Sequence, residues 1–428
     1  MSTGDRLLLL VGGAGAKQGL DCARQARARG LRIWLTDTAE NLAQAPDVVA
    51  LAEQVTVLPY HDAAACVAWA TDRARRDAFI GVFGFREFAV EAAAAVAEAL
   101  GLPGNPLPAV RCVRDKLACR RALQELGFRQ PAAALCSSRG EALAFAAAHP
   151  PGPWIVKPPA AMASLGVSLV ADPADWGPAI AHVAGGRQVL TALFERQGMA
   201  VESQPDAARG SFLVECFQPG DEFSAEGLFV YGQPHVLVLT AKRTTSGPHF
   251  VELGHAMPAE LDPAVTRAAA ETVEAALRSL GLRWGVFHVE FWLDGGRPVL
   301  GEVHVRAGGD YIHFMTQHVT GIELFGAVFD QLLGRRLEPA DWRPRRGAAV
   351  RYLDPPPGRV TAIDGWDAVR EDPACLVANG KLQVGDLVPA LRCSLDRSSF
   401  VVTTGGTTPE AVLAADRLCA AVRVEVAP

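Results

Sequence analysis

The sequence of 428 residues lacks three features that would each point to a class of protein. It has no excess of basic residues, because 41 Lys and Arg stand against 47 Asp and Glu and give a net charge of -6. No stretch approaches the roughly 18 apolar residues of a membrane helix, and the first apolar run is too short for a signal peptide. We therefore expect a cytoplasmic protein that binds neither nucleic acid nor a membrane.

The sequence also lacks a cysteine framework. Its nine cysteines are an odd number, they are scattered from Cys22 to Cys419, and no two form a C-x-x-C pair. This pattern favours reduced thiols in partly buried positions over disulfide bonds or a zinc site.

What the sequence does contain is enough apolar residue, 50% of the chain, to build two to four domains. The first hundred residues alternate apolar strands with helical segments, starting with the strand RLLLLV, a glycine turn and a helix. This order predicts an α/β unit with a parallel sheet over residues 1–105. The Pro- and Gly-containing segment 102–108 is typical of a connector.

The rest of the chain predicts α+β structure. A helix is expected from Val113 to Gly127, followed by short strands of a mixed or antiparallel sheet and a helix at about 321–333. A polar, proline-broken segment precedes Arg346, and the last residues again follow the order strand, glycine turn, helix, strand. We therefore expect a second unit at 106–335 and a third at 336–428.

A glycine loop follows the first strand, with Gly13, Gly15 and Gly19 in the spacing G-x-G-x-x-x-G. Asp37, after the next strand, is a loose match to the acid that binds ribose in dinucleotide folds. The motif is weak by itself. It fits a tight strand-to-helix turn, and it also fits an anion or substrate group bound at the helix N-terminus.

Two lysines are candidates for binding an anion. Lys157 ends the apolar strand PWIVK, and a loop of small residues follows it. A buried lysine is unfavourable unless it meets a negative charge, and a loop of this kind can close over one. Lys116 lies in the predicted helix, where the alternative is a solvated surface lysine.

The hairpin at 284–306 carries an unusual row of polar residues. If its loop is the three residues 295–297, Glu290 lies opposite Glu302 and His288 lies opposite His304. Opposed carboxylates repel each other unless a cation lies between them. A two-residue Gly-Gly turn would instead send the two glutamates to opposite faces of the sheet, and the sequence leaves both registers open.

The first register predicts a Mg²⁺ site, because carboxylate oxygens and phosphates are the ligands that this ion prefers. Arg306 follows on the same strand face, where it could stabilise an oxyanion near the metal. The alternative is a surface ion pair between Arg306 and Glu302.

Together, Lys116, Lys157 with its loop, LVECFQPGDEFSAEG and GEVHVRAGGD resemble the ATP-grasp superfamily, in its L-amino acid ligase branch of carboxylate-amine ligases. The resemblance covers nearly the whole chain. It implies a preATP-grasp domain at 1–105, an ATP-grasp domain at 106–335 with a lid subdomain at about 131–220, and a C-terminal domain like that of this branch and of biotin carboxylases at 336–428.

The resemblance also implies roles for individual residues. Lys116 and Lys157 match the lysines that contact nucleotide phosphates, Glu215 and Phe217 match the adenine hinge, and Glu222 matches the acid that binds ribose. The tip of the phosphate-covering loop matches Ser164, Leu165 and Gly166. The implied metal ligands are Glu290, Glu302 and His304, the implied catalytic residues are Arg306 and Glu302, and the implied substrate contacts are His255, Gly308, Gly309 and Arg306.

One residue departs from the family pattern, since His304 stands where E-x-N-x-R motifs have Asn. Imidazole is a poorer ligand than an amide oxygen for hard Mg²⁺, so His304 could instead orient a glutamate or a water, or touch substrate. The segment 242–258 matches a loop beside the acceptor site, and Lys242, Arg243, Glu252 and His255 are further candidates for substrate contact. For His255 the alternative is a turn residue after Gly254.

The activity that the resemblance implies is ATP-dependent C-N bond formation through an acyl phosphate, with release of ADP and phosphate. Its cofactors would be ATP and Mg²⁺, with one or two ions and with Mn²⁺ as a candidate substitute. The expected partners are a small carboxylate and an amine, such as two amino acids joined to a dipeptide, and a homodimer is a candidate assembly because this branch is often oligomeric. Alternatives are a ligase for a non-amino-acid carboxylate, a biotin-type carboxylase, and an inactive nucleotide-binding protein.

Overall fold

The computed structural model describes residues 6–15, 17–159, 161–196, 210–339 and 342–427. The first unit contains the predicted parallel sheet, in the strand order β3-β2-β1-β4. Its elements are β1 (Leu7–Val11), α1 (Gln18–Ala28), β2 (Arg32–Asp37), α2 (Ala39–Gln44), α3 (Pro46–Val49), β3 (Gln54–Val57), α4 (Ala63–Arg73), β4 (Phe79–Phe83) and α5 (Val90–Leu100). The prediction of an α/β fold for this part of the chain is confirmed.

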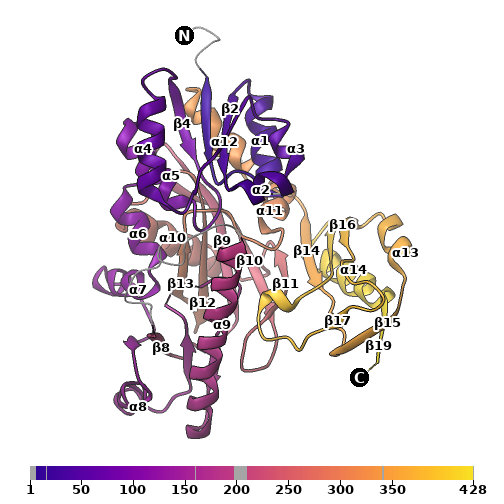
Figure 1. The fold of residues 1–428 in the computed structure, drawn as a ribbon. Coiled ribbons are helices and arrows are strands. Elements are labelled where there is room, and N and C mark those ends of the chain that lie inside the picture. The colour runs from indigo at the N-terminus through magenta and orange to yellow at the C-terminus, as the bar shows by residue number, and fades with distance from the viewer. Residues whose placement is uncertain (1–5, 16, 160, 197–209, 340–341, 428) are drawn as a thin grey trace.

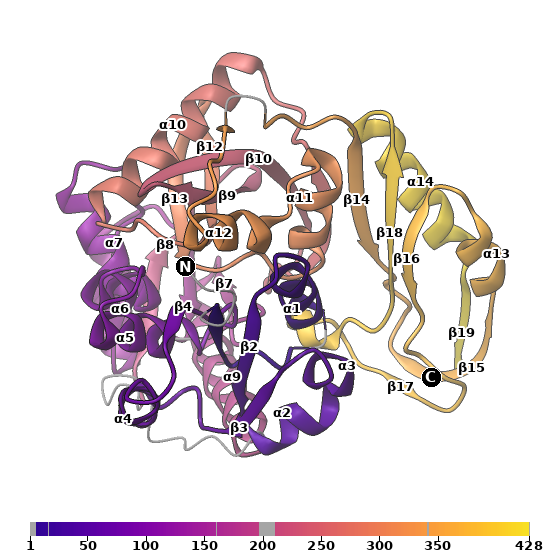
Figure 2. The same ribbon diagram turned by 90° about the horizontal axis from the view of Figure 1, so that it is seen from above.

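Strand β1 shows why this sheet is buried on both faces. Leu8 and Leu10 belong to one apolar cluster, with Phe325 and Phe329 of α12 (Leu324–Leu332), whereas Leu7 and Leu9 belong to another, with residues of α4 and α5. The helix α12 comes from the second unit, so the first unit packs tightly against it (Figure 2). This packing places the loops at the carboxyl ends of the parallel strands beside the second unit.

Asp37 has a structural role in the glycine loop. Its carboxylate is buried and accepts hydrogen bonds from the backbone N–H of Ala14 (2.8 Å) and Thr38 (2.8 Å) and from the side chain of Asn41 (2.7 Å). These bonds tie the loop to the end of β2. Asp37 is 0% exposed and does not line the cleft, so its carboxylate holds the loop and the structure gives no support to the match with a ribose-binding acid.

The single helix predicted from Val113 to Gly127 covers the end of one helix, α6 (Leu107–Arg114), and the whole of a second, α7 (Lys116–Glu125). The break is at Asp115, whose carboxylate accepts from the backbone N–H of Leu117 (3.0 Å) and Ala118 (2.9 Å). Aspartate is a strong N-cap, so it starts a new helix here. Lys116 consequently occupies the first position of α7 and not the middle of a helix.

Residues 133–216 form a four-stranded antiparallel sheet in the order β5-β8-β6-β7. The elements are β5 (Ala133–Cys136), α8 (Arg139–Ala148), β6 (Trp154–Lys157), β7 (Ser168–Val170), η1 (Pro173–Asp175), α9 (Trp176–Arg196) and β8 (Phe212–Cys216). Helix α8 and strand β8 lie at the opposite end of the molecule from the first sheet (Figure 1).

An eight-stranded sheet joins the second and third units, in the order β13-β12-β9-β10-β11-β14-β18-β16. Strand β14 pairs with β11, so the third unit extends the sheet of the second, and Figure 2 shows its elements along one side. The strands are β9 (Glu222–Val230), β10 (Gln233–Thr244), β11 (Glu252–Met257), β12 (Val286–Asp294), β13 (Arg297–His304), β14 (Gly347–Tyr352), β16 (Cys375–Asn379) and β18 (Phe400–Gly405).

The remaining elements cover or flank this sheet. Strands β17, β15 and β19 form a separate small sheet, and no helix among the described residues is long and apolar enough to cross a membrane. All nine cysteines are free. These elements are α10 (Pro263–Ser279), α11 (Ile312–Thr320), β15 (Gly358–Asp364), α13 (Trp366–Glu371), β17 (Leu387–Val388), η5 (Ser394–Asp396), α14 (Thr408–Ala421) and β19 (Arg423–Ala427).

The hairpin β12–β13 has the two-residue Gly-Gly turn, which is the second of the two registers that the sequence left open. Asp294 pairs with Arg297, and this register continues to the pair of Phe291 with Leu300. Gly295 and Gly296 have φ of +57° and +75°, which suits the tight turn that two glycines favour in a hairpin.

A β-bulge then restores the predicted pairing at the site. Val289 pairs with Val303 and His288 with His304, so Gly301 and Glu302 together lie opposite Glu290. The extra residue shifts the alternation, and the two glutamates reach the same face although the turn has two residues. A Cβ at Gly301 would lie 2.9 Å from the backbone oxygen of Glu290, so the bulge depends on this glycine.

Candidate active site

A cleft of about 800 Å³ opens where the three units meet. It is lined by the glycine loop and the segment after β4, by the loop after β6, by the polar face of strands β9 to β13, and by the turn around η5. Segments far apart in the sequence therefore contribute to one site.

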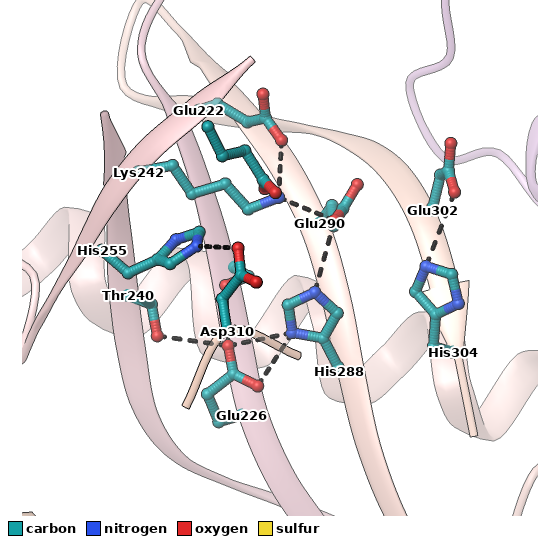
Figure 3. Close-up of polar contacts among 12 residues, drawn as sticks. Glu222, Glu226, Thr240, Lys242, His255, His288, Glu290, Glu302, His304 and Asp310 are labelled. Atoms are coloured by element: carbon teal, nitrogen blue, oxygen red, sulfur yellow. Dashed lines mark hydrogen bonds and ion pairs between the residues drawn. The ribbon is translucent and has the colours of Figure 1, made fainter. Parts of the chain in front are cut away.

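Lys242, on β10, lies at the centre of the carboxylates on this sheet face. Its ammonium group contacts Glu222 (2.7 Å), Glu252 (3.0 Å) and Glu290 (2.7 Å), and its side chain is 1% exposed. Burial acts to lower the pKa of Lys242, but the three carboxylates outweigh it and raise that pKa well above its usual value. Figure 3 shows the ammonium group between Glu222 and Glu290. Lys242 was predicted to contact substrate, whereas its contacts here are with carboxylates of the chain itself.

His288, which lies on β12 two residues before Glu290, contacts the same cluster of carboxylates. Its Nδ1 lies 2.9 Å from the buried carboxylate of Glu226, and its Nε2 lies 3.3 Å from Glu290 (Figure 3). Burial acts against the charged ring, but the two carboxylates raise the pKa of His288 to about 9. The imidazolium and the Lys242 ammonium group therefore hold Glu290 through the same carboxylate oxygen, Oε1.

Glu302 brings the predicted metal ligands and phosphate lysines together. It forms an ion pair with Lys116, lies 3.8 Å from Lys157 Nζ, and lies 3.5 Å from His304 Nε2. One ligand atom each from Glu290, Glu302 and His304 fall within 4.8 Å of one another. The bulge has thus placed a possible cation site beside two lysines. Burial acts to raise the pKa of Glu302, but Lys116 and its other partners hold that pKa well below its usual value.

Glu87, a residue that the sequence analysis missed, joins His304 to Arg306. Its carboxylate accepts from Arg306 Nε (2.7 Å) and lies 3.0 Å from His304 Nδ1. Burial acts to raise the pKa of Glu87, but Arg306 and His304 hold that pKa well below its usual range. The available signal was its place just after the parallel strand β4, since functional groups gather at the carboxyl ends of such strands.

Glu215 and Lys157 form a buried ion-pair group with Arg120. Lys157 Nζ lies 2.9 Å from Glu215, and Arg120 binds both carboxylate oxygens of Glu215. Burial acts to raise the pKa of Glu215, but the two cations lower it to about 2. Arg120 was not predicted, because a helical arginine is usually a surface residue.

The remaining residues predicted for the nucleotide lie around the same cleft. Phe217 stacks with Phe250, with ring centroids 5.7 Å apart, and Ser164 lines the cleft with a φ of +55°. Gly166 instead packs against α9, because a Cβ there would lie 3.1 Å from the Cα of Val183. The structure therefore brings Ser164, but not Gly166, to the cleft wall.

The predicted substrate residues lie at the other end of the cleft. His255 is a buried residue of β11 and not a turn residue, and its Nε2 lies 3.2 Å from Asp310. Gly309 lines the cleft, whereas the backbone oxygen of Gly308 accepts from Gln18 Nε2 (2.9 Å) of the glycine loop.

Asp310 is also held by two residues of the third unit that the sequence analysis missed. Arg397 donates to both of its carboxylate oxygens (2.6 and 2.9 Å), and the hydroxyl of Tyr352 donates to one of them (2.9 Å). Burial acts to raise the pKa of Asp310, but His255 and Arg397 lower it strongly. No local sequence pattern connects residues this far apart, so only the fold could reveal this contact.

Comparison with known families agrees with this geometry. The ATP-grasp domain model matches residues 151–313, and the model of L-amino acid ligase C-terminal domain 2 matches residues 351–427. The first match spans strands β6 to β8 and the hairpin with Glu290 and Glu302. The second spans most of the third unit.

Among curated proteins, the chain is 27% identical over 304 residues to an uncharacterized protein, y4rH, of Sinorhizobium fredii, covering 70% of this chain and 59% of that protein. It is 29% identical over 296 residues to mouse (Mus musculus) carnosine synthase 1, covering 66% of this chain and 33% of that protein. The chain thus matches only part of the length of these relatives.

Among solved structures, an L-amino acid ligase from Bacillus licheniformis superposes with a TM-score of 0.76, at 23% identity, over 100% of both chains. A phosphoribosylglycinamide synthetase from Anaerococcus prevotii superposes with a TM-score of 0.68, at 15% identity, over 99% of this chain and 100% of that one. At such identities the likeness concerns the fold. The two family models match in order along the chain, so the protein carries an ATP-grasp domain followed by an L-amino acid ligase C-terminal domain.

Proposed function

We propose that the protein is an ATP-dependent ligase that joins a carboxylate to an amine, with amino acids as substrates and a dipeptide as product. The observation that carries this proposal is the convergence of Glu290, Glu302 and His304 between Lys116 and Arg306. This arrangement offers cation ligands, a phosphate-binding charge and an oxyanion-binding charge in one cleft. We also propose that the three domains have the predicted boundaries, 1–105, 106–335 with the lid at about 131–220, and 336–428.

ATP would bind at the nucleotide end of the cleft, which we define by Lys116, Lys157, Glu290 and Glu302. Both lysines are already paired with carboxylates, so their ammonium groups are held in position before the phosphates bind. Phe217, Glu215 and Glu222 would surround the adenosine, and the loop with Ser164 and Gly166 would cover the phosphates.

The donor set fits a divalent cation, because its two carboxylates and one imidazole lie within 4.8 Å of one another. Glu290, Glu302 and His304 would hold Mg²⁺, which in this role neutralises phosphate charge and orients the nucleotide. An imidazole ligand suits Mn²⁺ better than Mg²⁺. The presence of His304 where the family motif has Asn therefore makes Mn²⁺ a candidate substitute for Mg²⁺. Glu87 would then fix the ring, since a hydrogen bond at Nδ1 leaves Nε2 free toward Glu302.

In the proposed reaction, a substrate carboxylate attacks the γ-phosphoryl group of ATP and forms an acyl phosphate, while ADP leaves. The amine attacks the acyl carbon, loses a proton, and inorganic phosphate leaves as the amide forms. Lys116 and Lys157 stabilise charge on the transferred phosphoryl group. Arg306, which Glu87 orients, stabilises the oxyanion of the tetrahedral intermediate together with backbone N–H groups near Gly308 and Gly309.

His255 would act on the amine side of the same pocket. It is buried, its Nε2 faces Asp310, and its Nδ1 has no hydrogen-bond partner among the described residues. A buried ring nitrogen without a partner is unfavourable unless a ligand completes it. We assign to it the binding of the amino group of a substrate.

The test measures ADP and phosphate release over pairs of amino acids, with mass spectrometry of the amide and hydroxylamine trapping of the acyl phosphate. We expect E302Q to lose nearly all turnover, because it removes a charge that both lysines face. E338Q is the matched control, since Glu338 is an exposed partner of Arg336 far along the chain. Turnover only with organic acids that lack an amino group would overturn dipeptide formation. Turnover only with bicarbonate and biotin would indicate a biotin-type carboxylase. If E302Q kept the biological activity of the wild type unchanged, the protein would be an inactive nucleotide-binding protein.

A further inference from the structure

The charges that line the cleft are balanced at one end and not at the other. Each lining carboxylate of the described residues lies within ion-pair distance of a cation; these residues are Glu87, Glu215, Glu222, Glu252, Glu290, Glu302 and Asp310. Two lining cations, Lys17 and Arg86, have no carboxylate partner within the described ranges. Both belong to the first unit, and neither is used in the proposed reaction.

Lys17 lies on the glycine loop, against aromatic rings of the second and third units. Its ammonium group is 3.9 Å from the ring centroid of Tyr311 and 4.8 Å from that of Phe400. Burial and the charge of Lys381 lower the pKa of Lys17 to about 8, against a smaller opposing effect of Asp310. The rings favour a cation there, while no carboxylate neutralises it.

Arg86 lies on the other side of the same loop. Its guanidinium group is 5.6 Å from the ring centroid of Tyr60, and Nη1 lies 3.4 Å from the Tyr60 hydroxyl. A Cβ at Gly15 would lie 3.0 Å from a ring carbon of Phe85 and 3.5 Å from Arg86 Nε, so the loop runs directly beside both residues.

The loop that carries Lys17 is fixed beside the reacting groups. Gln18 Nε2 donates to the backbone oxygen of Gly308, two residues after Arg306. Ser394, from the third unit, also lines the cleft, is 6% exposed, and its hydroxyl has no hydrogen-bond partner in the described structure. Two cations and an unpaired hydroxyl thus line the cleft that the substrate would enter.

We propose that Lys17 and Arg86, with Ser394, bind a substrate carboxylate other than the one that is activated. This inference rests on the proposed ligase function and adds the substrate class to it. The bound carboxylate belongs either to the side chain of an acidic donor or to the α-carboxylate of the acceptor amino acid. Both present the same planar anion to an arginine fork and a lysine.

Two pairs of substrates that differ mainly in charge separate the sources. The donor arm compares glutamate with glutamine at a fixed acceptor, and the acceptor arm compares alanine with alaninamide at a fixed donor. In one arm we expect the acid to have a kcat/KM higher by about 10- to 100-fold, the range for a charge-assisted hydrogen bond. K17M and R86Q should each bring that ratio toward one, whereas K381M, a lysine near Lys17 that does not line the cleft, should keep it.

Binding without turnover keeps this test separate from that of the ligase function. Calorimetry in the presence of Mg-ADP should show glutamate or alanine binding to the wild type and to K381M, and at least tenfold weaker binding to K17M and R86Q. Binding of this kind without any ADP release over all substrate pairs would refute the ligase and keep the carboxylate site. Equal ratios in the wild type and both variants, or no preference for the acid in either arm, would refute the carboxylate site and keep the ligase.

Discussion

At the nucleotide end of the cleft, cations and carboxylates lie against each other in pairs and triplets, whereas at the glycine-loop end Lys17 and Arg86 lie against aromatic rings. The first arrangement is neutral before any ligand binds, and it comes largely from neighbouring strands of one sheet. The second is assembled from units hundreds of residues apart and has an excess of positive charge. This difference teaches that one end is built to hold charge in fixed positions and the other to receive it.

The largest effect on stability should come from removing Lys242, the cation that contacts Glu222, Glu252 and Glu290 at the paired end, which is the nucleotide end together with these neighbouring carboxylates. In K242M, three carboxylates within about 3 Å of the lost ammonium group would remain buried without it. Breaking a buried ion pair from one side typically costs about 3–5 kcal/mol of unfolding free energy. Urea denaturation at pH 7 measures this loss. Because a lower pH protonates the carboxylates that have lost their cation, the loss should shrink as the pH falls toward 5.

The matched control is K381M, which removes an exposed lysine of the third unit. A K242M protein as stable as K381M would show that the carboxylates share their charge with solvent instead of with Lys242. The comparison between the two ends would then fail, because the nucleotide end would no longer be a self-neutralised cluster.

Much of the paired end could be predicted from the sequence, since its residues lie in two short strands and in motifs with fixed spacing. Glu290, Glu302, His304 and Arg306 were found together because alternation along a strand fixes which residues share a face. Even there the reasoning was incomplete. The turn has two residues, and the glutamates converge only because a bulge at Gly301 adds a residue that no turn rule contains.

The contacts between units could not be predicted, because they depend on how the three units pack. Glu87 meets Arg306 across 219 positions of sequence, and Arg397 meets Asp310 across 87. Lys17 lies within a glycine loop whose spacing does not indicate which ligand the loop binds. Periodicity and motif spacing describe neighbours along the chain, and they are silent about partners brought together by packing.

An intermediate effect should follow from removing the bulge. In G301V, the new Cβ would meet the backbone oxygen of Glu290 at 2.9 Å, so the strand must shift or slip by one residue. We expect a loss of about 1–3 kcal/mol in unfolding free energy and loss of the cation site. Calorimetric titration with Mn²⁺ and thermal denaturation measure both.

Gly177 in α9 provides the control for this substitution, because no atom lies within 4 Å of a Cβ placed there. G177A should keep wild-type stability and Mn²⁺ binding. If G301V also binds Mn²⁺ as the wild type does, the convergence of Glu290 and Glu302 does not need the bulge, and the account of the paired end must be revised.

The smallest effect on stability is expected from K17M, which removes a cation from the unpaired end. No carboxylate of the described residues is left without its partner, so K17M should lose no unfolding free energy relative to the wild type at pH 7. The difference in stability between K17M and the wild type also depends on pH. Since the pKa of Lys17 falls from 10.5 to about 8 on folding, the charged side chain is disfavoured in the folded protein at neutral pH, and this penalty disappears as the pH rises through the two values. The stability of K17M relative to the wild type should therefore decline as the pH is raised from 8 toward 10. A large loss of stability in K17M at pH 7 would mean that the cation holds the fold together, and Lys17 would then belong with Lys242 as a structural charge instead of one kept ready for a ligand.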